Sequence, residues 1–88
     1  MADEKITRAI EICKDYGVTK LILFGSAVND LKTARDLDLA VDGINGWKLI
    51  ELAAELENDL LINVDVVPIK GNDSFINHIL PRSKVLYA

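Results

Sequence analysis

Cysteine is nearly absent from this 88-residue chain, which contains only Cys13. A single cysteine excludes an intramolecular disulfide and suggests a reducing compartment, the cytoplasm. Cys13 continues the helical spacing of Ile6, Ala9 and Ile10, so we expect a small core residue rather than a nucleophile. Half of the residues are hydrophobic, and the length predicts one domain, residues 1–88, with a single core.

Long hydrophobic runs and a surplus of positive charge are also missing. No segment approaches the length needed to cross a bilayer, and the N-terminal residues lack the basic-then-apolar order of a signal peptide. The 10 Lys and Arg against 14 Asp and Glu give a net charge of −4. This balance argues against binding of duplex nucleic acid, which needs clustered cations. It does not exclude a nucleotide held through a bound metal.

Hydrophobic periodicity predicts helices and strands that alternate along the chain. Helices are expected at 4–16, 27–31, 47–59 and 73–80. Strands are expected at 21–24, 36–41, 62–67 and 85–87, the first of them central and covered on both faces. Gly17 should end the first helix, and Asp73 should cap the last. The third helix should bury one side made of Leu49, Ala53, Leu56 and Leu60. This order predicts an α/β (α+β) fold, a small mixed sheet packed against helices.

Two aspartates, Asp36 and Asp38, alternate along the second predicted strand. Residues i and i+2 of a strand point the same way, so the two carboxylates share a face, roughly 6 to 7 Å apart. Leu37 and Leu39 then point into the core. Like charges side by side raise each other's pKa unless a cation lies between them, and oxygen-only ligands favour Mg²⁺, Mn²⁺ or Ca²⁺.

A third acid, Asp65, interrupts the apolar run 60–67, which otherwise has the pattern of a buried strand. An ionised carboxylate in such a setting is costly unless it is paired or bound to metal. If this strand lies beside the other, Asp65 joins Asp36 and Asp38 in a cluster able to bridge two metal ions about 3.5–4 Å apart. The alternative for Asp36 and Asp38 is the solvent face of an edge strand. For Asp65 it is a solvent-facing residue or a helix-cap partner.

Gly25 and Ser26 follow the run 21–24, where a strand meets the expected start of a helix. Backbone N–H groups and the helix dipole favour an anion at such a position. Gly25 permits close approach of the backbone to a phosphate, and the Ser26 hydroxyl can donate to a phosphate oxygen. A Gly-Ser pair alone is usually just a turn. Its significance here comes from its position before the carboxylate strand.

The pattern of Gly25-Ser26, nine residues, then Asp36 and Asp38, with Asp65 on a later strand, resembles the polymerase-β-like nucleotidyltransferase superfamily. The length resembles its minimal prokaryotic members, and the resemblance covers nearly the whole chain. It implies the fold of that superfamily and an active site with two Mg²⁺ ions. The implied reaction is in-line attack on the α-phosphate of a nucleoside triphosphate such as ATP, with release of pyrophosphate.

The resemblance also assigns roles to residues. Asp36 and Asp38 would ligate both ions. Asp65 would ligate the catalytic ion and act as base or orient the attacking hydroxyl. Gly25 and Ser26 would hold the triphosphate.

Small members of this superfamily are often the antitoxin half of a two-protein module. Their partner is a HEPN-domain RNase toxin, which some are understood to inactivate by adding adenylyl groups to a tyrosine. The resemblance therefore implies a nucleotidyltransferase that acts as an antitoxin on a HEPN toxin. Two alternatives stay open: a catalytically impaired module of the same fold that neutralises its partner by complex formation, and an unrelated small α/β domain with an incidental acid cluster.

The chain departs from the family pattern after Ser26. Relatives often have a basic residue and a further glycine there, whereas residues 27–30 are Ala-Val-Asn-Asp and add a negative charge. A serine commonly precedes the first aspartate, and here that residue is Arg35. We therefore hypothesise that Arg35 or Lys32 supplies the missing cation for the triphosphate.

Trp47 and His78 are the remaining residues of interest. A chain this short leaves little surface to enclose an acceptor, so we expect a second protein or self-association to complete the site. Trp47, at the start of a helix, is a candidate interface anchor, although packing onto its own sheet is at least as good an explanation. His78 has no carboxylate or cysteine at ligand spacing, so we expect a surface or packed histidine.

Overall fold

The structure is a computed structural model that describes residues 2–88. Its elements, in chain order, are α1 (Asp3–Asp15), β1 (Lys20–Phe24), α2 (Ser26–Asn29), β2 (Asp36–Asp42), α3 (Trp47–Leu60), β3 (Asn63–Pro68), α4 (Asp73–Ile79), the 3-10 turn η1 (Leu80–Arg82) and β4 (Lys84–Tyr87). The predicted order of helices and strands is confirmed. The short α2 differs most, because it ends at Asn29 rather than at residue 31. Within residues 2–88, no helix is both long and apolar enough to cross a membrane.

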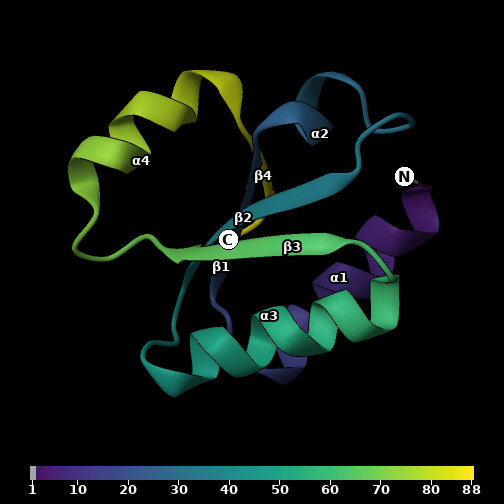
Figure 1. The fold of residues 1–88 in the computed structure, drawn as a ribbon. Coiled ribbons are helices and arrows are strands. Elements are labelled where there is room, and N and C mark those ends of the chain that lie inside the picture. Colours follow the sequence, from purple (N-terminus) through teal and green to yellow (C-terminus); the bar gives the residue numbers. More distant parts are fainter. Residues whose placement is uncertain (1) are drawn as a thin grey trace.

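The four strands form one mixed sheet in the order β3-β2-β1-β4 (Figure 1). β1 is antiparallel to both of its neighbours, whereas β2 and β3 are parallel and are joined by α3 as a crossover helix. β1 is central, and Leu21, Ile22 and Leu23 are buried, as predicted for a strand covered on both faces. β3 and β4 form the two edges of the sheet. The predicted mixed sheet packed against helices is therefore confirmed.

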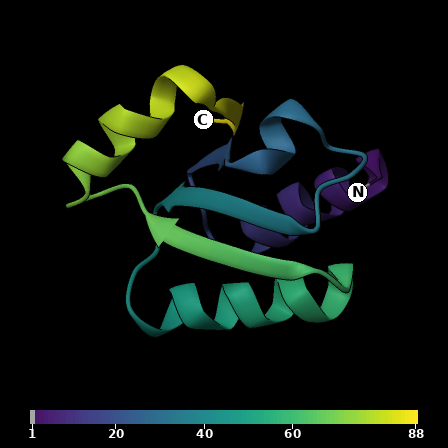
Figure 2. The ribbon, with the colours of Figure 1, turned by 45° about the horizontal axis from the view of Figure 1, so that its top comes forward.

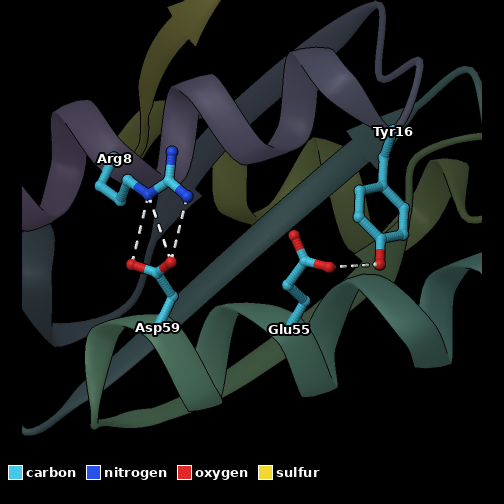
Figure 3. Close-up of polar contacts among 4 residues, drawn as sticks. All are labelled: Arg8, Tyr16, Glu55 and Asp59. Atoms are coloured by element: carbon cyan, nitrogen blue, oxygen red, sulfur yellow. Dashed lines mark hydrogen bonds and ion pairs between the residues drawn. The ribbon is translucent and has the colours of Figure 1, made fainter.

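Helices α1 and α3 lie side by side on one face of the sheet, and α4 lies on the other (Figures 1 and 2). Polar contacts also join α1 to α3: the Arg8 guanidinium donates to the Asp59 carboxylate, with N–O distances of 3.1 to 3.3 Å. The Tyr16 hydroxyl donates to Glu55 over 3.1 Å (Figure 3). The larger core cluster lies between these helices and the sheet.

The buried sides of α1 and α3 differ in part from the prediction. The buried residues are Ala9, Ile12 and Cys13 on α1, and Leu52, Leu56 and Leu60 on α3. Ile6, Ile10, Leu49 and Ala53 are only partly buried. Each helix packs against both the sheet and its neighbour helix. Ile12 and Leu52 are buried because of this double packing.

Two local predictions can be compared directly with the structure. Gly17 has φ of +91° and follows the last turn of α1, so its predicted role at the helix end is confirmed. The predicted cap by Asp73 is wrong, because Asn72 occupies that position and its side chain donates to the Pro68 carbonyl over 3.3 Å. Cys13 is buried, which confirms the predicted core position, and burial raises the pKa of its thiol to about 12.

Candidate active site

The three predicted acids lie on one face of the sheet. In the parallel pair of β2 and β3, Asp38 is the direct register partner of Asp65, and Asp36 is the partner of Asn63. Leu37 and Leu39 are fully buried on the opposite face, against α1 and α3. The prediction that β3 lies beside β2 and brings Asp65 to the other two acids is therefore confirmed. Whether these acids ligate metal stays a prediction.

The expected burial of Asp65 is wrong. Asp36 and Asp65 are exposed and Asp38 is half-buried. β3 is an edge strand, and α4 covers this face farther along, where Ile22 and Ala40 contact Ile76 and Ile79. The end of this face that carries the acids is open to solvent, so the charged carboxylate of Asp65 stays hydrated. What distinguishes Asp65 from an ordinary exposed carboxylate is its position beside Asp38.

Asp38 is the electrostatically strained member of the set. Partial burial raises the pKa of its carboxyl above the ordinary range, and the charges of Asp65 and then Asp36 raise it further. A cation placed among the three carboxylates would remove the repulsion and favour the ionised form. The donor set is made of carboxylate oxygens alone, which fits a hard divalent ion such as Mg²⁺.

The acids open into a hollow of about 420 Å³ that also includes Glu57, Asn63 and Val64. The Asn63 amide donates to Asp36 Oδ1 over 3.2 Å, and Glu57 Oε2 accepts the Val64 N–H over 3.0 Å. In the described part of the chain, no three His, Cys, Asp or Glu side chains lie in an arrangement that could hold a metal ion. The carboxylates share a face without converging, so metal binding would require side-chain rotation.

Glu57 and Asn63 are site residues that the sequence analysis did not identify. Asn63 stands two positions before Asp65 on the same strand and therefore shares its face, a spacing visible in the sequence. Glu57 had no such signal, because its place depends on how the end of α3 lies against the edge of β3.

Gly25 lies against the Asp38 carboxylate. Phe24 is the register partner of Asp38, and the chain turns directly after it, with Gly25 at φ of +79°. A Cβ atom at this position would overlap Asp38 Oδ2. The structure therefore places Gly25 beside the Asp38 carboxylate, as the motif predicted, whereas Ser26 lines a neighbouring hollow. Since α2 has only one turn, any contribution from a helix dipole is small.

A second hollow, of about 290 Å³, is lined in part by Gly25. Its lining includes Ser26, Asn29, His78 and Arg82. His78 is exposed, as predicted. Arg82 is a further residue that the sequence analysis missed, because a large sequence separation lies between it and Ser26.

The hypothesis about Arg35 is not favoured by its place in the structure. Arg35 lines a different hollow, of about 630 Å³, together with Lys5, Glu57 and Asn63 among others. That hollow does not include Gly25 or Ser26. A role for Arg35 in nucleotide binding stays a prediction. The structure does not bring Arg35 into the hollow that Gly25 and Ser26 line.

Trp47 is 76% exposed, so the explanation that it packs onto its own sheet is wrong. Ile50, one turn later on α3, is also exposed. The role of Trp47 as an interface anchor stays a prediction.

A family model described as polymerase beta, nucleotidyltransferase, matches residues 5–88 of the chain. No curated protein has significant sequence similarity to it.

Several solved structures share its fold. One is the tri-AMPylated Shewanella oneidensis HEPN toxin in complex with MNT antitoxin, with a TM-score of 0.81 and 22% identity over 100% of this chain and 73% of the other. Another is a toxin–antitoxin complex with AMP-PNP, with a TM-score of 0.80, 23% identity and coverage of 100% and 74%. A third is a proposed minimal nucleotidyltransferase, with a TM-score of 0.74, 23% identity and coverage of 92% and 88%. At these identities the likeness establishes the fold.

Proposed function

The chain belongs to the polymerase β nucleotidyltransferase family, and from this premise we propose that it transfers a nucleotidyl group, adenylyl from ATP, to a hydroxyl acceptor. One observation carries the proposal: Asp36, Asp38 and Asp65 occupy one open face of the sheet, next to the close contact of Gly25 with Asp38. An open face admits both a nucleotide and a bulky acceptor. A merely structural acid cluster would not need the glycine.

In the proposed reaction the acceptor oxygen forms a bond to the α-phosphorus, and the bond to the β-phosphate oxygen breaks, which releases pyrophosphate. Asp36, Asp38 and Asp65 would hold two Mg²⁺ ions, which when bound stabilise charge on the attacking and leaving oxygens. Asp65, which is exposed on the edge strand, would orient the acceptor hydroxyl and accept its proton. Gly25 lets the backbone approach the phosphates, and the Ser26 hydroxyl donates to a phosphate oxygen.

We propose a HEPN-domain toxin as the acceptor, with this chain as the antitoxin. The similar structure from S. oneidensis contains an AMPylated HEPN toxin with an MNT antitoxin, and a related toxin–antitoxin structure contains AMP-PNP. A tyrosine of the toxin would supply the hydroxyl group. The exposed acid face supports an acceptor of protein size, because no element of the described chain covers Asp65.

The second candidate is a module of the same fold with impaired catalysis, which neutralises a toxin by complex formation. The segment after Ser26 favours it, since residues 27–30 contain no cation and add the charge of Asp30. The lack of convergence among the described acids is also consistent with it.

The two candidates differ in the mass of the toxin after incubation. The chain is incubated with α-labelled ATP, Mg²⁺ and the HEPN protein encoded by the neighbouring gene, and both proteins are analysed by mass spectrometry. We expect an added adenylyl mass on the toxin, which disappears with Asp36→Asn. Asp42→Asn removes one charge from the far end of the same strand and should leave transfer intact. A stable complex without added mass would instead support the binding module.

A further inference from the structure

The hollow that Gly25 and Ser26 line contains the positive charge of Arg82, which residues 27–30 lack. It brings Arg82 and His78, from η1 and α4, toward Ser26 and Asn29 of α2. Figures 1 and 2 show the segment after α4, in yellow, lying beside the short blue helix α2. None of the residues that line this hollow is an aspartate or a glutamate. Its polar groups can donate hydrogen bonds, which is the chemistry that a phosphate group requires.

The two hollows next to Gly25 differ in the chemistry of their lining. One contains Asp36, Asp38, Asp65 and Glu57, and the other contains a guanidinium and an imidazole. Gly25 borders both, because it lines the second hollow and contacts the Asp38 carboxylate of the first. A chain of phosphates that lies against Gly25 therefore has carboxylates in one neighbouring hollow and the side chains of Arg82 and His78 in the other.

The backbone that carries Arg82 and His78 is held in place. Ile76 and Ile79 fix α4 to the sheet by packing against Ile22 and Ala40. The turn after α4 is closed by Ser83, whose hydroxyl donates to the Leu80 carbonyl over 2.8 Å. Among residues 2–88, no carboxylate forms an ion pair with Arg82. Its guanidinium is thus available for a ligand.

We propose that Arg82, assisted by His78, binds the β- and γ-phosphates of the nucleoside triphosphate and stabilises the pyrophosphate as it leaves. The inference rests on the proposed function and names the cation that the segment after Ser26 does not provide. A guanidinium suits this role because its donors match two phosphate oxygens at once. Charge that develops on the leaving group would be stabilised by the guanidinium.

Calorimetric titration with Mg²⁺–ATP, with AMP and with pyrophosphate tests the proposal on the whole chain. Arg82→Ala should weaken Mg²⁺–ATP binding by about tenfold or more, because it removes a charge-assisted contact. It should weaken pyrophosphate comparably and leave AMP within about twofold, as expected for a contact with the terminal phosphates. Arg82→Lys should retain part of the affinity. Lys48→Ala removes one positive charge from α3, on the other face of the sheet, and is the matched control.

The outcomes separate the inference from the proposed function. If the unaltered chain binds Mg²⁺–ATP and Arg82→Ala binds it equally well, the inference is wrong and the proposed function stands. If Arg82→Ala weakens ATP and AMP equally, Arg82 does not act on the terminal phosphates, and the inference is again wrong. If the unaltered chain binds no triphosphate, both fall. Circular dichroism melting of each variant verifies that the exposed Arg82 can be replaced without loss of the fold.

Discussion

Replacement of Asp38 by asparagine should stabilise the metal-free protein at neutral pH. The substitution keeps the shape of the side chain and removes the charge that burial, Asp65 and Asp36 all disfavour. With carboxylates roughly 5 to 7 Å apart at a solvated surface, each repulsion amounts to about 0.5–1 kcal/mol before screening. Salt at physiological strength reduces both. We therefore expect Asp38→Asn to raise the free energy of unfolding at pH 7 by about 1 kcal/mol.

The stability gained by Asp38→Asn should depend on pH. The folded state raises the pKa of Asp38, so it binds the proton more tightly than the unfolded chain does. Proton binding by Asp38 therefore stabilises the folded state below the ordinary carboxyl pKa of about 4. This stabilisation is lost as pH rises through the higher pKa that Asp38 has in the folded state. The advantage of Asp38→Asn should therefore be full at pH 7 and should shrink toward zero as pH falls to about 3.

Urea unfolding followed by circular dichroism, in chelator at pH 7 and at pH 3, measures both quantities. The control is Asp42→Asn, at the end of the same strand, which should change stability by less than about 0.5 kcal/mol. Addition of Mg²⁺ should stabilise the unaltered protein, because the ion binds the folded state. The unaltered protein should then be more stable than the Asp38→Asn variant. An Asp38→Asn variant that is less stable than the unaltered protein at both pH values would refute the electrostatic reasoning.

Two further substitutions test the geometry around the site. Gly25→Ala should destabilise the fold by about 1–3 kcal/mol, since its backbone lies in a region that favours glycine, and should also displace the Asp38 carboxylate. Gly46→Ala is the control, because Gly46 also has positive φ but has nothing within 4 Å of the added carbon; equal losses in urea unfolding would contradict the close contact. Trp47→Ala should cost less than about 0.5 kcal/mol in the same assay, because the side chain is largely exposed, yet it should weaken binding to the proposed HEPN partner in a pull-down titration. A large loss of stability, or unchanged binding, would remove Trp47 as an anchor.

Local features of the site could be predicted because they depend on short stretches of chain. The shared direction of Asp36 and Asp38 follows from the two-residue period of a strand, and the exposed Gly25-Ser26 turn follows from the end of an apolar run. The burial of Cys13 followed from helical spacing. The core residues Ile12 and Leu52 were missed, because the buried side of each helix also depends on contact with the other helix.

The order of elements, the acids that share a strand face and the glycine after β1 follow from short stretches of sequence, since each is set by neighbours a few positions away. Contacts between distant parts of the chain pair Asp65 with Asp38 on an exposed edge and bring Asn63 to Asp36. They also bring Arg82, rather than Arg35, near Ser26. These outcomes depend on strand order and on the path of the chain after α4. Strand order is selected by the packing of the whole core, and no stretch of sequence contains that information alone.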